Sequence, residues 1–292
     1  MRYRISEIKL DIRQSQEELP TAVRKKIKKK DLGIHDLKII KESVDARKKP
    51  DIKKVYTLEF SCSQKLPLKE AAERRYQVPV ADGSGKDRPV VVGFGPAGMF
   101  AGLILAEMGL KPVILERGEP VEQRIKTVQK FWKDGILDPE SNVQFGEGGA
   151  GTFSDGKLTT GIKDVRISKV KEELIQAGAD SAVGYRQLPH IGTDVLREVV
   201  KKIRGKIIAL GGDIRFESRL TGICLKEDEP DRGQRDLSPG ALESKKYLTA
   251  LKINSGERMI CRRAVIAPGN SARDTFQTLY ERKVPLEGKA FA

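Results

Sequence analysis

The pattern Gly93-x-Gly95-x-x-Gly98 constrains the fold of this chain more than any other feature. An apolar run at 90–92 leads directly into it and predicts a buried strand. Apolar residues at helical spacing follow, and a second apolar run at 112–115 ends on Glu116. Strand, turn, helix, strand and acid therefore stand in the order of a βαβ unit that binds a dinucleotide.

Each glycine of this pattern has a predicted use. Gly93 makes the tight turn, Gly95 lets a pyrophosphate approach bare backbone, and Gly98 lets the helix pack closely on the strand. The start of the helix offers free N–H groups and a partial positive charge to the diphosphate. Glu116 is placed to accept the ribose hydroxyls. A glycine-rich turn in an ordinary α/β sheet would explain the glycines but not the placed acid.

Length and cysteine content restrict the wider class. A chain of 292 residues is long enough for two domains with sizeable cores. The apolar stretch 99–115 is interrupted by Glu107 and Lys111, and the first residues lack the apolar core of a signal peptide. The three cysteines are single and far apart, which predicts no disulfide framework, no zinc site and a cytoplasmic location.

The net charge of +14 is concentrated in the N-terminal part, since residues 1–88 hold 23 Lys and Arg against 14 Asp and Glu. Alternating apolar residues from Tyr3 predict a strand, 17–30 a helix, and 37–44 and 53–61 two more strands. We therefore expect a small basic α+β domain of βαββ order at 1–66. Its lysines could bind RNA or another acidic partner. No aromatic platform accompanies them, and a charged helix face is usually only solvated.

The remaining chain is expected to form a linker at 67–87, with Gly83-Ser-Gly85, and a Rossmann-like domain at 88–292. An amphipathic helix is predicted at 120–132 and another at 194–210, followed by a strand at 213–216. Strands at 219–225, 247–253 and 258–262 would form a three-stranded meander, with a polar loop at 226–246.

A second glycine-rich stretch runs from Gly146 to Gly156. So many glycines exclude a helix or strand interior and indicate a backbone that passes close to something. A flexible surface loop is the alternative, but Phe145, Phe153 and Leu158 indicate that the stretch packs. Beside a nucleotide-binding fold, its expected neighbour is the rest of the ligand.

Three motifs together resemble one family. They are Gly-Phe-Gly-Pro-Ala-Gly (93–98), Leu-Glu-Arg-Gly (115–118) and Phe-Gly-Glu-Gly-Gly-Ala-Gly-Thr-Phe-Ser-Asp-Gly-Lys-Leu (145–158). The chain resembles, along its whole length, uncharacterised bacterial FAD-dependent dehydrogenases of the glutathione-reductase-like superfamily. The resemblance implies FAD as cofactor and an oxidoreductase activity. It also implies these FAD contacts: Gly93, Gly95, Pro96, Ala97 and Gly98 on the pyrophosphate; Glu116 on the ribose; Arg117 and Arg124 along the adenosine and diphosphate; Gly148, Gly149, Ala150 and Thr152 along the ribityl chain and flavin.

The stretch 264–270 resembles the strand and turn that return to the cofactor in this superfamily, with Gly269 in the turn. Pro268 stands where threonine is usual, so only backbone contacts are expected there. The superfamily's later Gly-Asp strand and substrate domain have no counterpart, which leads us to expect a longer protein and a poor flavin site in this chain alone.

The catalytic residue is open, with four candidates: Lys157, Asp155, His190 and Arg273. Lys157 and Asp155 follow the glycine stretch, where a lysine would favour a reduced flavin anion. Asp155 could instead cap its turn, His190 could be a loop residue, and Arg273 could pair with Asp274. Because there is no cysteine pair, disulfide reduction is not expected. No second glycine fingerprint for NAD(P)H is present, so the substrate is expected to be the reductant. An NAD(P)-binding enzyme and a nucleic-acid-associated flavoprotein are the alternatives.

Overall fold

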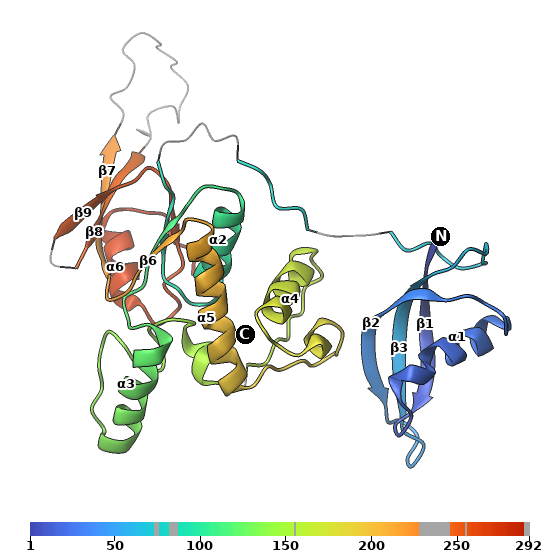
Figure 1. Ribbon diagram of the computed structural model, residues 1–292. Coiled ribbons are helices and arrows are strands. Elements are labelled where there is room, and N and C mark those ends of the chain that lie inside the picture. The colour runs from blue at the N-terminus through green and yellow to red at the C-terminus, as the bar shows by residue number, and fades with distance from the viewer. Residues whose placement is uncertain (73–75, 82–86, 155, 228–245, 255, 289–292) are drawn as a thin grey trace, which may run out of the picture. The chain divides into compact units, whose positions relative to one another are not determined.

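The computed structural model describes residues 1–72, 76–81, 87–154, 156–227, 246–254 and 256–288, and it is a mixed α/β structure (Figure 1). Its chain divides into two compact units. Unit 1 combines Met1–Gln77 with Asp155–Val195, and unit 2 combines Val78–Ser154 with Leu196–Ala292. Compactness thus groups 155–195 with the N-terminal part. The predicted glycine pair in the linker, Gly83 and Gly85, lies outside the described residues.

Unit 1 contains the predicted βαββ arrangement. Its sheet has the order β1-β3-β2 and is antiparallel, and a short 3-10 helix η1 leads into helix α1. The elements are β1 (Arg2–Asp11), η1 (Gln16–Glu18), α1 (Leu19–Ile27), β2 (His35–Asp45) and β3 (Lys53–Ser61). Residues of the predicted linker extend this sheet, because Tyr3 pairs with Glu70 beside the outer edge of β1.

A bulge in β1 explains its apolar pattern. Ile5 and Ile8 are both buried although three positions apart, and the register of β1 on β3 shifts between them. Glu7 has a φ of 57°, which turns the strand so that both isoleucines face the core. Lys26 of α1 donates to the carbonyls of Ser6 and Glu7, at 2.9 Å each, and so ties the helix to the bulge.

The rest of unit 1 holds helix α4 (Arg166–Gln176) and the 3-10 helix η3 (Ser181–Gly184), neither of which we predicted. α4 begins where the Asp164 carboxylate accepts from the amide of Arg166, at 2.8 Å. Its Leu174 is buried, and its buried Glu173 pairs with Lys169 one turn earlier. Its apolar residues Ile167, Val170, Leu174 and Ile175 stand at helical spacing, so the sequence did carry a signal for this helix.

Unit 2 is built on a parallel sheet of order β10-β4-β5-β6. The strands are β4 (Val90–Val92), β5 (Val113–Leu115), β6 (Asp213–Arg215) and β10 (Ala264–Ile266). Helix α2 (Pro96–Glu107) connects β4 to β5, so the predicted βαβ unit is confirmed. β4 and β5 are entirely buried, as apolar strands inside a parallel sheet should be.

Helices and a second sheet complete unit 2. Helices α3 (Val121–Asp134) and α5 (Thr193–Ala209) and the meander β7 (Leu220–Glu227), β8 (Lys246–Ile253) and β9 (Glu257–Ile260) match predicted elements. The 3-10 helix η2 (Ala150–Phe153) interrupts the glycine stretch. Most of the predicted loop 226–246 lies outside the described residues. Side chains from β4 and β5 share one core with the meander.

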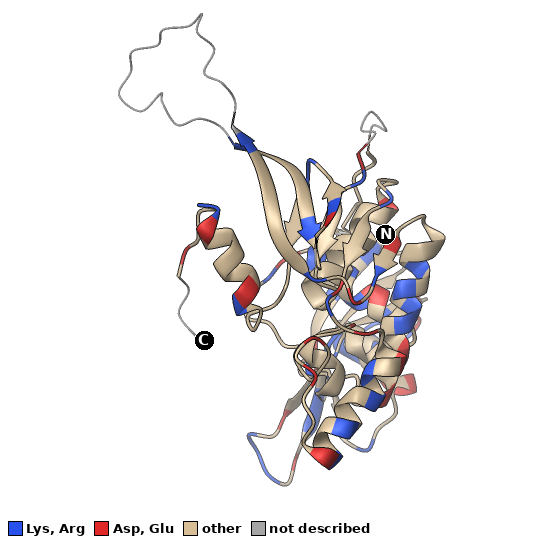
Figure 2. Ribbon diagram, turned by 90° about the vertical axis from the view of Figure 1, so that its left-hand side faces the viewer, with Lys and Arg blue, Asp and Glu red and all other residues tan. Residues whose placement is uncertain are grey.

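Helix α6 (Arg273–Glu281) was not predicted. Its charged residues stand only near its ends, and its middle is uncharged (Figure 2). Leu279 packs into the core shared with the meander, whereas Phe276 and Tyr280 are exposed. Among the described residues, we find no helix with the length and apolar character that crossing a membrane requires.

Candidate nucleotide-binding site

A cavity of about 360 Å³ opens in unit 2 at the carboxyl ends of β4 and β5. This edge of a parallel sheet is where α/β folds bind ligands. Five segments far apart in sequence line it. The lining residues are Val92, Gly93, Gly95, Pro96, Ala97, Leu115, Glu116, Arg117, Gln144, Phe145, Gly146, Gly149, Ala150, Gly151, Ser218, Arg219, Leu220, Ala267, Pro268, Gly269, Asn270, Ser271 and Thr275.

The three glycines of the fingerprint differ in what surrounds them. A Cβ on Gly93 would lie 2.2 Å from the Ala267 carbonyl oxygen, and Gly93 also has a φ of 93°. A Cβ on Gly98 would lie 1.8 Å from the Gly93 oxygen. The surrounding backbone therefore requires glycine at both positions, 93 and 98. Among the residues that the structure describes, a Cβ on Gly95 would meet nothing closer than the Gly149 Cα at 3.7 Å, so their packing does not require glycine there.

Glu116 is buried and lines the cavity, but it also holds the site together. One of its carboxylate oxygens accepts from the amide of Phe94 at 2.7 Å. The other accepts from the amides of Gly118 at 2.9 Å and Gly146 at 3.0 Å. A carboxylate has about four lone-pair sites, so one acceptor position remains for a ligand hydroxyl. The sequence indicated the ligand role and gave no sign of the three amide bonds.

Arg124 has a different position from the one that the resemblance implied. Its side chain is fully buried, does not line the cavity, and donates to five carbonyl oxygens of the loop 142–149. The oxygens belong to Asn142 (2.9 Å), Val143 (3.1 Å), Gly146 (3.2 Å), Glu147 (2.6 Å) and Gly149 (2.9 Å). Direct contact with a diphosphate is thus corrected to a buried contact with the glycine loop, because the loop wraps around the guanidinium.

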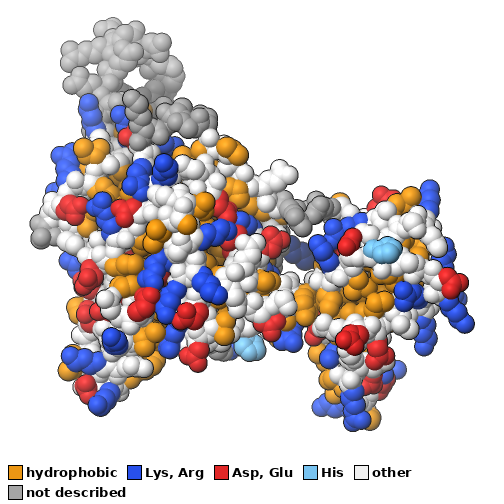
Figure 3. All heavy atoms as spheres, viewed as in Figure 1, with side chains coloured by type: hydrophobic (Ala, Val, Ile, Leu, Met, Phe, Trp, Pro, Cys, Tyr) orange, Lys and Arg blue, Asp and Glu red, His pale blue; other side chains and the backbone are white. Residues whose placement is uncertain are grey.

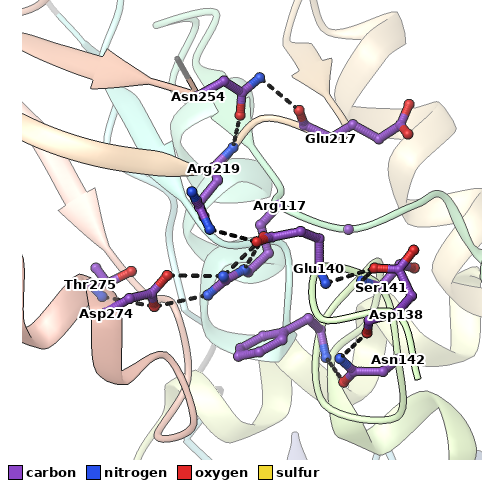
Figure 4. A network of polar contacts seen from close by, with 12 residues as sticks. Arg117, Asp138, Glu140, Ser141, Asn142, Glu217, Arg219, Asn254, Asp274 and Thr275 are labelled. Atoms are coloured by element: carbon purple, nitrogen blue, oxygen red, sulfur yellow. Dashed lines mark hydrogen bonds and ion pairs between the residues drawn. The ribbon is translucent and has the colours of Figure 1, made fainter. Parts of the chain in front are cut away.

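Arg117 lines one wall of the cavity and lies in a polar network (Figure 4). Its guanidinium donates to both oxygens of Asp274, at 3.0 and 2.9 Å, and to Glu140 at 2.9 Å. It also lies over the Phe145 ring, 4.2 Å from the centroid. Arg219 donates to the same Glu140 at 2.6 Å. The network joins the end of β5 to α6, and both carboxylates neutralise the two arginines.

The other predicted cofactor residues divide into two groups. Pro96, Ala97, Gly149, Ala150 and Gly269 line the cavity. Gly148 and Thr152 are buried and do not line it, and the Thr152 hydroxyl donates to the Glu147 carbonyl at 3.1 Å. These two shape the loop from inside.

Sequence reasoning missed the wall formed by the meander and α6. Ser218, Arg219, Leu220 and Thr275 reach the cavity only because those elements fold back onto the parallel sheet. None of them lies in a motif, so only the fold could reveal them.

Among the catalytic candidates, the structure brings together Lys157 and His190, which form an antiparallel bridge in unit 1. The amide of Leu158 donates to Pro189 O, and that of Ile191 donates to Gly156 O, at 2.9 and 3.2 Å. Both side chains are exposed. Lys157 and His190 are therefore a non-hydrogen-bonded antiparallel pair, in which the two side chains lie close together on one face.

The remaining two candidates are separate. Asp155 lies outside the described residues. Arg273 is the exposed first residue of α6. The suggested pairing of Arg273 with Asp274 is wrong, because the Asp274 carboxylate binds Arg117 instead.

Glu147, on the glycine loop, is a buried carboxyl that the sequence did not single out. One oxygen accepts from the amide of Val121 at 2.8 Å and from Arg204 at 2.9 Å. The other oxygen has no hydrogen-bond partner among the described residues. Burial raises the pKa of Glu147 from its usual value of 4.5 to about 7, against the opposing effects of Val121 and Arg204.

This pKa predicts how stability depends on pH. Folded protein holds a proton on Glu147 that unfolded protein releases above pH 4.5, so this contribution to stability is lost as pH rises to about 7. The effect is on the order of 3 kcal/mol. Thermal unfolding of a Glu147→Gln variant should show a weaker fall in stability between pH 5 and 8 than the unchanged protein. Parallel curves would contradict the assignment.

The basic residues of the N-terminal domain are partly committed to its own structure. Arg24 donates to the Leu32 carbonyl at 2.9 Å, Lys26 binds the β1 bulge, and Lys29 donates to Gln64 at 3.3 Å. The helix face predicted for an acidic partner thus offers fewer uncommitted cations than its sequence indicated. On the face of this domain that Figure 3 shows, hydrophobic side chains gather in a patch.

The comparisons with known proteins cover this chain unevenly. Residues 2–61 match a family model described as a domain of unknown function (DUF8436). An uncharacterized protein of Clostridium beijerinckii is 45% identical over 302 residues. The match includes 100% of this chain and 53% of that protein, so the chain spans about half the length of its relative.

Solved structures with partial structural similarity were also found. Thermovibrio ammonificans THI4 has a TM-score of 0.42 and 15% identity, with 69% of this chain and 64% of that chain covered. Bacillus cereus glycine oxidase has a TM-score of 0.33 and 15% identity, with coverages of 68% and 59%. A ternary complex of aklavinone-11 hydroxylase with FAD and aklavinone has a TM-score of 0.29 and 16% identity, with coverages of 67% and 35%.

Proposed function

We propose that the cavity of unit 2 binds FAD, and that the chain is the nucleotide-binding part of an FAD-dependent oxidoreductase. The observation that carries this proposal is the space over Gly95. It lies beside the start of α2 and the buried Glu116, and no atom of the described residues fills it. A helix N-terminus, bare backbone and an acid with one open acceptor position together suit a nucleotide diphosphate and its ribose.

The residues present suit the two ends of an adenosine diphosphate group. The first turn of α2 leaves the amides of Ala97 and Gly98 without acceptors inside the helix, and these would donate to the diphosphate. Glu116 would accept one ribose hydroxyl. A cavity of about 360 Å³ is at the lower end of the range for small-molecule sites, so it matches part of a dinucleotide. When bound, a flavin would supply the electron-transfer chemistry.

The substrate and the catalytic group belong to this proposal only as predictions. Lys157 and His190 are the candidates that the structure brings together. Both can donate hydrogen bonds and carry a positive charge, which suits an anionic substrate. The chain spans 53% of its Clostridium beijerinckii relative, so the catalytic group is not sought among these residues alone.

The nucleotide released from purified protein tests the function. After incubation with excess FAD, we expect a flavin absorbance spectrum and, after denaturation, release of FAD. Weak retention of FAD during purification is expected of this chain alone. Release of NAD instead would favour the alternative enzyme class. A protein that takes up neither FAD nor NAD would refute the proposed function.

A Glu116→Ala variant gives a second, combined readout. It should lose flavin and stability together, because removing the carboxylate leaves three buried amides without acceptors, at about 1–3 kcal/mol each. Flavin titration and thermal unfolding of the same sample measure both losses. Full stability with lost flavin would show that the three amide bonds do not matter.

A further inference from the structure

The charge of Arg124 is buried against neutral groups. All five acceptors of its guanidinium are main-chain carbonyls, and its side chain has 0% exposure. The carboxylates of Glu116 and Glu147 act on it only through space. Burial outweighs them and lowers the pKa of Arg124 from 12.5 to about 10.

Arg204 in the same unit, a partly buried cation, shows the more usual arrangement. It binds the carboxylates of Glu122 and Glu147 directly, and its charge is thereby compensated. Removing a cation from water without a counter-ion in contact is unfavourable. Such a buried cation is kept where another interaction offsets the cost. The loop around Arg124 supplies dipoles but no such charge.

The loop that wraps Arg124 has its other side on the cavity. Gly146, Gly149 and Ala150 all line the cavity. In a planar trans peptide the C=O and the following N–H point in opposite directions. Because the Gly149 carbonyl points at Arg124, the Ala150 N–H points away from it. Gly149 also packs against the Gly95 turn, its Cα 3.7 Å from the position of a Gly95 Cβ.

We infer that Arg124 is a positioning residue whose buried positive charge acts, through the peptides of the glycine loop, as the counter-charge for the anionic part of the bound ligand. This rests on the proposed function, in which that part is a diphosphate. The guanidinium orients the Gly149–Ala150 peptide toward the phosphates. Its charge is screened little by salt, because it lies behind protein and not in water.

Binding of adenosine, AMP and ADP to ligand-free protein measures this effect. The three ligands share base and ribose and differ in phosphate charge. In the unchanged protein, affinity should rise steeply from adenosine to ADP. In Arg124→Gln that rise should shrink by about tenfold, because one positive charge near the phosphates is lost, while adenosine affinity changes little. A purely structural role would weaken all three ligands equally.

Arg166→Gln is the matched control, because it removes the same charge from an exposed ion pair with Asp164 in unit 1. Its three affinities should stay unchanged. If Arg124→Gln fails to fold, Arg124→Lys decides: the retained charge should keep the rise from adenosine to ADP although the melting temperature falls.

An undiminished rise in folded Arg124→Gln would overturn the inference, as would loss of the rise in folded Arg124→Lys. Failure of the proposed function gives a different result, because the unchanged protein would then bind neither FAD nor any of the three ligands. Binding of all three with equal affinity to the unchanged protein would also overturn the inference, but not nucleotide binding itself.

Discussion

Replacing Gly95 with alanine or valine should abolish flavin binding while the protein remains folded. Gly95 has ordinary extended backbone angles, φ −74° and ψ −176°, and a Cβ there finds 3.7 Å of clearance. The added carbon would occupy only the space that we assign to the diphosphate. Losing two charge-assisted hydrogen bonds of about 1.5–3 kcal/mol each corresponds to at least a hundredfold weaker binding.

Flavin titration and thermal unfolding should be measured on the same samples. We expect the melting temperature of Gly95→Ala to stay within a few degrees, since alanine at a helix N-cap has only a modest effect. A full flavin spectrum in the Gly95→Val variant would exclude this site. Loss of flavin together with loss of folding would show that the protein itself needs glycine at 95.

Gly98→Ala should have the opposite phenotype and destabilise the fold itself. Its Cβ would lie 1.8 Å from the Gly93 oxygen and 2.9 Å from the Gly93 carbonyl carbon, both backbone atoms that cannot move aside cheaply. The strand end and the helix must separate, which we expect to lower the free energy of unfolding by about 3 kcal/mol. Urea unfolding measures this directly.

Gly205→Ala is the matched control for Gly98→Ala. Gly205 lies inside α5, and apart from the helix's own backbone no described residue comes within 4 Å of a Cβ there. Alanine should therefore stabilise the helix by about 0.5–1 kcal/mol. Equal effects of the two substitutions would mean that the close approach at Gly98 is not essential.

The βαβ unit could be predicted because its constraints are local. Strand, turn and helix follow each other within about 30 residues, and close backbone approach at Gly93 and Gly98 leaves glycine as the residue that fits. Arg124 shows the limit. Its sequence position on an amphipathic helix is compatible with a cofactor contact, and only the return of the loop 142–149 converts it into a buried residue.

Contacts between distant parts of the chain also explain why the cavity wall formed by the meander and α6 was not predicted. Arg117 binds Asp274, 157 positions later, and no sequence pattern announces a contact at that distance. Helix α6 was missed because three apolar residues in nine do not distinguish a short amphipathic helix from a loop. Glu147 was missed because a carboxyl among glycines gives no sign of being buried.

The order of strands in the parallel sheet has a consequence for synthesis on the ribosome. β4 lies between β5 and β10, yet β10 leaves the ribosome more than 170 residues after β4. Throughout that interval, Val90–Val92 has one edge without its final neighbour, and the part of the cavity wall that includes Thr275 does not yet exist. An unpaired apolar strand edge recruits other strands, so this period is when the nascent chain most needs protection from aggregation.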